Sequence, residues 1–426
     1  MRKKAFLLVL VAVGFLVSCD NGDTYEDYQV ARPLTMDVAQ FKAQAVSVTE
    51  PEPIISSGKI YTYRSYIFVN DVNRGFHVID NSNPTAPERI AFIKLEGNYD
   101  ISVKDDKLYA DSYGDLVIFD IANINDIKVS NRIVNAIYEN GGIWATDLEY
   151  PTADFYDYGN YDYQKDAIVG WTVTTERRLV SEYESRYGGR YYEDSSLANT
   201  TSSDSGPGRS VGQGGSLARF KIVGDYLYVV DYSNINIFDI SDVANPETLE
   251  DVQVAWDIET IFNQGDVLFI GGRQGMYIYD ITEPQKPTFI SEFRHGTACD
   301  PVVVDGDYAY VTLKGGNFCG NADSGLYVVD VSDLANPELK VIYPMSGPNG
   351  LGIKGDRLFV CDGEAGLKVF DKSDAPNVTE IDHFEDIFAY DVIPLDGSLL
   401  MIGEQTLYQY DYVENNIELI STFELN

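Results

Sequence analysis

Four acidic side chains are the first candidates for chemistry in this sequence of 426 residues. Asp100, Glu259, Asp300 and Asp391 take equivalent positions when the repeated segments of the chain are aligned. Carboxylates that gather at one place favour a divalent cation or the cationic group of a ligand, because like charges repel one another. The alternative is four separate, solvated carboxylates. No motif indicates a cofactor, and a divalent cation is the one cofactor that these four carboxylates would favour.

Recognisable enzyme signatures are missing from the sequence. The three histidines, His77, His295 and His383, lack the spacing of metal ligands or of a nucleophile's base. There is no phosphate-binding glycine loop and no dinucleotide fingerprint. With 67 acidic residues against 31 basic ones, carboxylate pairs are too common to indicate a glycosidase. We therefore expect binding rather than catalysis; the alternative is a glycan-directed hydrolase or lyase that uses the four carboxylates and His295.

The segments that position these residues recur along the chain. Seven apolar runs close on aspartate and lead through a polar turn to another apolar run, as in "GLYVVDVSDLANPELKV" at 325–341. Successive aspartates are 40, 119, 41, 50, 41 and 40 residues apart. A period near 40 is typical of propellers and other repeat folds. The marker aspartates are Asp80, Asp120, Asp239, Asp280, Asp330, Asp371 and Asp411.

Hairpin patterns precede most markers. In "VGDYLYVVD" (223–231), two β-rich runs flank a Gly-Asp pair that suits a tight hairpin turn. Each period then holds four short strands. This predicts an all-β fold, a β-propeller of seven four-stranded antiparallel blades over 54–426. We expect each marker aspartate to hold the turn between the third and fourth strands through local hydrogen bonds.

The first two blades, residues 58–120, open with "GKIYTYRSYIFVNDVNRGFHVID". They resemble the LVIVD repeats of a family of bacterial envelope lipoproteins, and the resemblance extends more weakly over 54–426. It implies a β-propeller carried by an envelope lipoprotein. The resemblance implies no particular reaction, so no catalytic residue is assigned to this chain on that basis.

The N-terminus predicts secretion and lipidation. A basic start is followed by an apolar stretch, residues 5–17, that is short for a membrane span, and then by "LVSC". We expect removal of the signal peptide 1–18, lipidation of Cys19 and a tether over 19–53. The chain would then be lipid-anchored in the bacterial cell envelope, at the outer membrane, on its periplasmic or its outer side. An ordinary signal peptide beside a chance cysteine is the alternative.

Net charge restricts the partners. The formal charge is -36, and loss of the three basic residues in 1–18 makes it -39. Such a chain repels nucleic acid and anionic headgroups, so nucleic acid is excluded as a partner. A glycan or an envelope protein is the expected partner, besides the membrane that holds the lipid.

Three further cysteines have different expected states. Cys299 and Cys319 lie in loops of the fifth blade that emerge on one face, so we expect a disulfide between them, with two free thiols as the alternative. Cys361 ends an expected strand, where a buried thiol is typical.

The interval of 119 residues between Asp120 and Asp239 predicts an insertion at about 137–216, without regular blades. It contains one expected strand at 167–174 and a Gly/Ser stretch at 202–216 that we expect to be mobile. Nine tyrosines between 150 and 192, among them Tyr161 and Tyr163, offer rings that stack on sugars. A solvated acidic loop is the alternative.

Three functions follow from these patterns. The chain is a binding or scaffold module, a glycan-directed enzyme, or a structural subunit of an outer-membrane complex. Fold alone does not distinguish them, because propellers support all three.

Overall fold

A computed structural model describes residues 24–137, 141–180, 211–297, 301–316, 322–414 and 416–426. Within these residues, no helix has the length and apolar character needed to cross a membrane. The chain forms two compact units. Of the described residues, the smaller unit comprises 24–35, 149–161 and 169–180, and the larger unit comprises the others.

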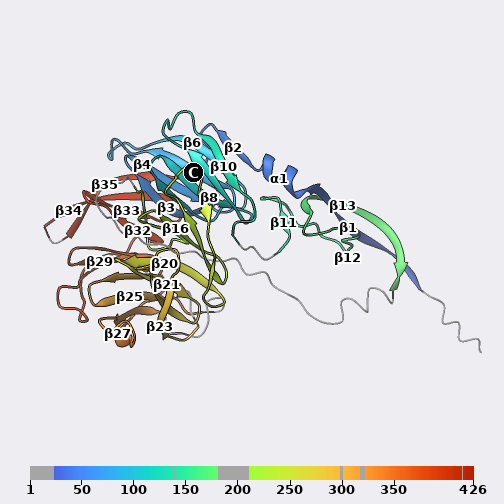
Figure 1. The fold of residues 1–426 in the computed structure, drawn as a ribbon. Coiled ribbons are helices and arrows are strands. Elements are labelled where there is room, and N and C mark those ends of the chain that lie inside the picture. Colours follow the sequence, from blue (N-terminus) through green and yellow to red (C-terminus); the bar gives the residue numbers. More distant parts are fainter. Residues whose placement is uncertain (1–23, 138–140, 181–210, 298–300, 317–321, 415) are drawn as a thin grey trace, which may run out of the picture. The chain divides into compact units, whose positions relative to one another are not determined.

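Seven antiparallel sheets form the β-propeller of the larger unit, which confirms the predicted fold (Figure 1). The strands of the first three are β3 (Ser57–Tyr63), β4 (Tyr66–Asp71), β5 (Gly75–Asp80) and β6 (Glu88–Leu95); β7 (Ile101–Lys104), β8 (Lys107–Ser112), β9 (Asp115–Asp120) and β10 (Lys128–Ile133); and β15 (Phe220–Val223), β16 (Tyr226–Val230), β17 (Asn234–Asp239), β18 (Glu247–Thr248) and β19 (Val252–Gln253).

The remaining four blades follow in chain order. They consist of β20 (Ile258–Gln264), β21 (Val267–Gly272), β22 (Gly275–Asp280) and β23 (Thr288–Arg294); β24 (Val302–Asp305), β25 (Tyr308–Leu313), β26 (Gly325–Asp330) and β27 (Glu338–Pro344); β28 (Leu351–Lys354), β29 (Arg357–Cys361), β30 (Leu367–Asp371) and β31 (Thr379–Phe384); and β32 (Asp391–Pro394), β33 (Ser398–Ile402), β34 (Thr406–Val413) and β35 (Asn416–Glu424).

Tight turns join the first two strands of the blades, as the hairpin patterns predict. Gly224 and Gly306 each have a φ of +59° at the first turn position, which glycine adopts without strain. In blade two the turn residues are Asp105 and Asp106, with φ of 47° and 61°. Positive φ at both central positions is the type I′ geometry that suits the twist of a hairpin.

The marker aspartates hold the turns between the third and fourth strands, which confirms their structural role. In six blades the Oδ1 atom accepts a hydrogen bond from the backbone N–H two residues later. The donors are Ser82 (2.8 Å), Ala122 (3.0 Å), Ser241 (2.8 Å), Thr282 (2.6 Å), Ser332 (3.0 Å) and Ser373 (2.8 Å). Asp411 departs from this pattern and accepts from Tyr412 N–H at 2.9 Å.

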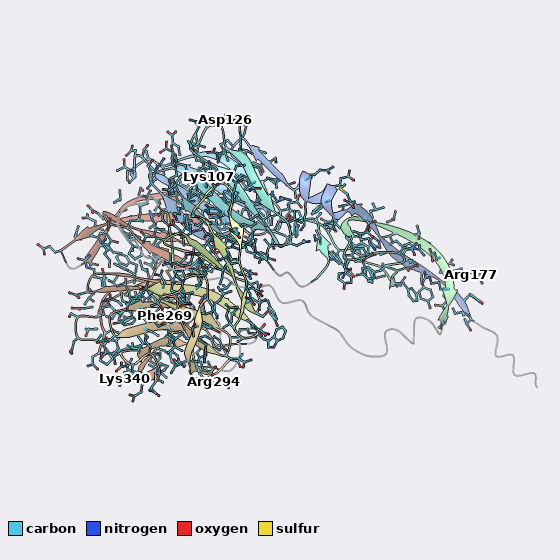
Figure 2. All side chains as sticks on the ribbon, viewed as in Figure 1. Lys107, Asp126, Arg177, Phe269, Arg294 and Lys340 are labelled. Atoms are coloured by element: carbon cyan, nitrogen blue, oxygen red, sulfur yellow. The ribbon has the colours of Figure 1, made fainter. Side chains whose placement is uncertain are left out.

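Apolar side chains between neighbouring blades form the core. Phe76 of blade one meets Phe119 of blade two edge to face, with ring centroids 6.0 Å apart. Phe269 lies among the packed sheets, whereas Arg294 and Lys340 project from outer strands (Figure 2). Burial of these faces is the main stabilising term of such a fold.

The ring closes by packing rather than by exchange of a strand, because each blade takes its four strands from one continuous segment. Apolar residues of blades one and seven form a common buried cluster. At the same junction Leu425 O accepts hydrogen bonds from Ile54 N–H at 2.9 Å and from the Arg89 guanidinium at 2.7 Å.

Residues 25–49 are structured, which differs from the tether predicted over 19–53. They form β1 (Tyr25–Asp37), α1 (Val38–Gln44) and β2 (Val46–Thr49), and β2 pairs with β6 at the outer edge of blade one. The buried Lys42 ammonium lies 2.6 Å from the Asp115 carboxylate of blade two. Sequence reasoning missed this because the partner of Lys42 is distant in the chain.

The insertion supplies a second, small sheet. It has the strand order β11 (Ile143–Trp144), β13 (Asp166–Leu179), β1 and β12 (Phe155–Tyr156). The strand predicted at 167–174 is therefore confirmed as part of β13. In the smaller unit, Tyr28, Val30 and Phe155 form a compact apolar cluster. Within the described part of 137–216 there is no regular blade.

Asp239→Ala should lower the free energy of unfolding by about 1 kcal/mol, because the turn after β17 loses a hydrogen bond to Ser241 N–H. Asp239→Asn retains an acceptor and should cost less than half as much. Denaturant unfolding of both variants measures the difference. Equal destabilisation by the two substitutions would contradict the hydrogen-bond role of this aspartate.

Candidate functional site

The inner strands of the seven blades surround a central channel and define its two ends. Consecutive inner strands contact one another around the ring, from β3 through β7, β15, β20, β24 and β28 to β32 and back to β3. We call the end at which these strands begin the entry face, and the end with the tight turns the exit face. The inner strands begin at Ser57, Ile101, Phe220, Ile258, Val302, Leu351 and Asp391.

Asp100 lies at the entry face, as predicted, but it is buried rather than solvated. Its side chain is 3% exposed, and its Oδ2 accepts hydrogen bonds from the N–H groups of Arg219 (2.6 Å) and Phe220 (3.1 Å). The Lys59 ammonium of blade one lies 3.3 Å from the same oxygen. Burial lowers the pKa of Lys59, and the Asp100 charge opposes that effect. Asp100 therefore joins the first three blades.

Asp391, the first residue of β32, is also fully buried. Its Oδ1 accepts a hydrogen bond from Val392 N–H at 2.9 Å. The carboxylate lies so close to Gly215 and Gly350 that a Cβ atom on either glycine would approach its oxygens to under 3.0 Å. Asp391 thus contacts the end of the insertion and not an open channel mouth.

The last residues of the insertion, 211–217, run through the channel, and we call them the plug segment. Val211 bridges to Lys104 near the exit face, Gln213 and Gly214 (β14) pair with β3, and Ser216 Oγ accepts from Leu351 N–H (2.6 Å) at the entry face. The plug segment therefore runs from the exit face, at Val211, to the entry face, at Ser216.

The structure corrects the prediction of mobility over 202–216 for residues 211–216. Their glycines are needed for close approach rather than for flexibility. A Cβ atom at Gly212 would lie under 3.0 Å from the Tyr61 ring and from Thr62 O. Composition alone does not separate these two uses of glycine. The signal that could have found the plug segment is the Gly-Gly pair at 214–215, four residues ahead of the inner strand β15.

A cavity of about 240 Å³ remains beside the plug segment. Its walls are the inner strands of blades four to seven together with Gly214, Gly215 and Ser216. Asn263 is 4% exposed, and its carboxamide donates to Gly265 O at 3.1 Å. Its Oδ1 atom has no hydrogen-bond donor among the described residues. An unsatisfied buried oxygen costs roughly 1–3 kcal/mol.

The other predicted site residues are dispersed or outside the described residues. Glu259 is half-buried in β20. His295 follows β23, is half-buried and has its Nδ1 atom 2.6 Å from Gly296 O. Tyr163 is 59% exposed, and its hydroxyl accepts from Gln164. The residues that lie outside the described ranges are Cys19, Cys299, Asp300 and Cys319.

No group of three or more His, Cys, Asp or Glu side chains in the described ranges is arranged to hold a metal ion. Cys361 is a buried free thiol at the end of β29, as predicted, and burial raises its pKa. Its thiolate is therefore disfavoured, and reactivity at this position is not expected.

Five aromatic residues of the insertion lie together in the smaller unit, and we call them the aromatic cluster. Ring centroids are 4.7 Å apart for Tyr150 and Tyr156, and 5.3 Å for Tyr150 and Trp171. Tyr158 lies 5.8 Å from Trp171 and 6.1 Å from Tyr161. Tyr150 is 54% exposed and Tyr158 is 39% exposed. The cluster therefore presents ring surface to solvent while its members support one another.

An ion-pair network stabilises the same sheet. The Arg32 guanidinium of β1 contacts Glu176 of β13 and lies 2.9 Å from Asp157 Oδ2. Arg178 contacts both carboxylates, at 2.9 Å from Glu176 and 3.5 Å from Asp157. These pairs cross-link the N-terminal strand to the insertion. Because the side chains are partly exposed, each pair contributes little by itself.

Comparison with known proteins identifies the repeat. The LVIVD repeat model matches residues 57–91, 214–254 and 295–344. These matches cover blade one, the end of the plug with blade three, and blade five. No curated protein matches the chain.

The solved structures to which this chain is similar are distant from it in sequence. The computationally designed Ika8 protein is 8% identical, with a TM-score of 0.48, over 86% of this chain and 89% of that one. A functionally unknown protein from Desulfotomaculum acetoxidans is 11% identical, with a TM-score of 0.47, over 84% of this chain and 95% of that one. PorZ, a surface component of the type-IX secretion system of Porphyromonas gingivalis, is 14% identical, with a TM-score of 0.48; 87% of this chain matches 39% of PorZ.

Gly215→Ala should destabilise the larger unit by about 1–3 kcal/mol, because the added methyl group meets the buried Asp391 carboxylate. Gly397→Ala is the matched control, since a Cβ atom there meets nothing within 4 Å. Denaturant unfolding measures both. Equal stability of the two variants would show that the plug segment does not lie against Asp391.

Proposed function

From a seven-bladed propeller that carries LVIVD repeats, we propose an envelope-anchored binding module that recognises a glycan through the aromatic cluster. The observation that carries this proposal is the group of mutually packed rings with exposed faces on Tyr150 and Tyr158. The propeller acts as the rigid scaffold, and the insertion provides the contact surface. Propellers in general serve as such modules.

The chemistry of the cluster suits a sugar. Aromatic rings offer flat apolar faces for the C–H groups of a pyranose, and tyrosine hydroxyls offer hydrogen bonds at the rim. Because Tyr150, Tyr156 and Trp171 already pack together, little side-chain entropy is lost on binding. The same features suit a polar-aromatic protein surface, which is the second kind of partner that a binding test has to separate.

Binding is favoured over hydrolysis by the state of the acidic residues. A glycosidase needs two carboxyl groups that face one sugar bond. Asp100 and Asp391 are buried and accept backbone hydrogen bonds, so they are poor candidates for an acid and a nucleophile. Two of the four carboxylates that the hydrolase or lyase alternative uses are therefore unsuited to that chemistry.

Anchoring through Cys19 is the second part of the proposal and rests on the "LVSC" motif. The first strand, β1, begins at Tyr25. Six residue steps span at most about 20 Å when fully extended. A lipid on Cys19 would consequently hold the start of β1 within about 20 Å of the membrane surface.

Tyr150→Ala should weaken glycan binding about tenfold or more, because it removes the most exposed ring of the cluster. A panel of immobilised bacterial and plant polysaccharides identifies the glycan, and calorimetry on the strongest hit gives the affinities. Trp256→Ala is the matched control, since Trp256 is 62% exposed in the larger unit. Equal loss in both variants, or no retained polysaccharide, would refute glycan recognition by the cluster.

Cys19→Ala should release the protein from the membrane fraction or leave the signal peptide uncleaved. The physical reason is that a lipidated cysteine supplies the apolar anchor. Fractionation and intact-mass measurement of the native protein and the variant test this. A variant with unchanged mass that stays in the membrane fraction would contradict lipidation at Cys19.

A further inference from the structure

We propose that the cavity beside the plug segment binds a short extended peptide with small side chains, which pairs with the inner strand edges of blades four to six. This site is independent of the aromatic cluster. It lies entirely within the larger unit and opens toward the exit face, where Gln264 and Asp305 line it.

The register of the sheets shows which backbone groups face the cavity. In antiparallel pairs, residues whose hydrogen bonds point toward the partner alternate with residues whose bonds point away. Ile261 N–H donates across the channel to Ala218 O (2.9 Å), and Leu351 N–H donates to Ser216 Oγ (2.6 Å). By alternation, the N–H and C=O groups of Asn263 and Ile353 also point away from their sheets and into the channel.

Val304 has the same orientation. Asp305 pairs with Tyr308 to close the β24–β25 turn, so the preceding residue, Val304, directs its backbone groups to the channel. Three different blades thus present an N–H and a C=O group to one cavity. Among the described residues, none of the three N–H groups, of Asn263, Val304 and Ile353, has a hydrogen-bond acceptor.

The plug segment demonstrates the expected mode of pairing within the same channel. Gln213 and Gly214 add to the edge of β3, and Gly212 N–H donates to Val103 O of β7 at 2.9 Å. An extended chain of small residues therefore fits between inner strands and satisfies their edges. Beside it, the inner strands of blades four to six offer similar edges, on which Asn263, Val304 and Ile353 have no such partner among the described residues. Addition of a strand to an open edge is an established mode of peptide recognition.

Size and charge limit the ligand further. The cavity of about 240 Å³ is smaller than the 300–1,000 Å³ typical of sites for drug-sized molecules, so a blocked dipeptide is the appropriate scale. Asp305 at the opening is paired with Lys372, and the chain as a whole carries a formal charge of -36. Anions are therefore disfavoured. A neutral amide can donate to the strand carbonyls and accept from the strand N–H groups at once.

Calorimetric titration of the full-length protein with N-acetylglycylglycinamide tests the proposal. We expect saturable binding at one site. The matched ligand is N-acetylsarcosylsarcosinamide, in which methyl groups replace two backbone N–H hydrogens, and it should bind at least tenfold more weakly. Because both titrations use the unaltered protein, the comparison does not depend on how a variant folds. Absence of saturable heat with the glycine compound, or equal affinity for the two compounds, would overturn the proposal.

Two further measurements place the ligand in the cavity and define its class. Asn263→Leu removes the buried carboxamide and should weaken binding of the glycine compound about tenfold, whereas Asn245→Leu, at an exposed turn, should leave it unchanged. Glycerol has a comparable size but no amide, and it should not compete. Equal effects of the two substitutions, or competition by glycerol at the concentration of the peptide, would also overturn the proposal.

Discussion

Seven strand edges face the central channel of the larger unit, and the backbone groups on those edges have to find hydrogen-bond partners. Packing of the blades into a ring buries the apolar faces between neighbouring sheets. It does not supply partners for the backbone groups that face the channel. Residues of the insertion supply some of these hydrogen-bond partners. The plug segment covers the edges of β3 and β7, Ser216 accepts from Leu351, and Ala218 accepts from Ile261.

Close packing of the plug has consequences for neighbouring residues. Gly215 and Gly350 lack side chains where the Asp391 carboxylate lies, and Asp391 is buried between them. The Asp391 carboxylate accepts a hydrogen bond from the Val392 N–H in that position, which offsets part of the cost of burying a charge. In blade two, Asp100 accepts hydrogen bonds from the N–H groups of Arg219 and Phe220 at the start of β15 and lies near Lys59. Both acids therefore stabilise the segment that leads from the insertion into β15.

The insertion and the N-terminal segment make a sheet together, and this sheet differs in character from the blades. In the larger unit, apolar faces and turn hydrogen bonds stabilise a repetitive scaffold. In the smaller unit, an exposed aromatic cluster lies on a sheet that Arg32, Asp157 and Glu176 cross-link. In the proposed binding function, the larger unit is the scaffold and the smaller unit provides the contact surface.

The sequence by itself determined the repeat, the number of blades and the role of the marker aspartates, because these depend on local patterns. Asp80 and its equivalents bond to a residue two positions away, so their function is visible in any single copy of the motif. It also determined that Cys361 is buried, since the strand pattern around it is local. The strand at 167–174 was predictable for the same reason.

Only the tertiary structure decided what Asp100, Asp391, Lys42 and the Gly-Gly pair at 214–215 do. Lys42 is separated from Asp115 by 73 residues, and Asp100 from Arg219 by 119. Gly215 meets Asp391 from a segment whose composition is that of a flexible linker. Such contacts depend on which segments the closed ring brings together, and no periodicity in the sequence encodes them. Local hydrogen bonding and hydrophobic alternation can therefore be inferred from the chain, whereas pairing across the channel requires the folded ring.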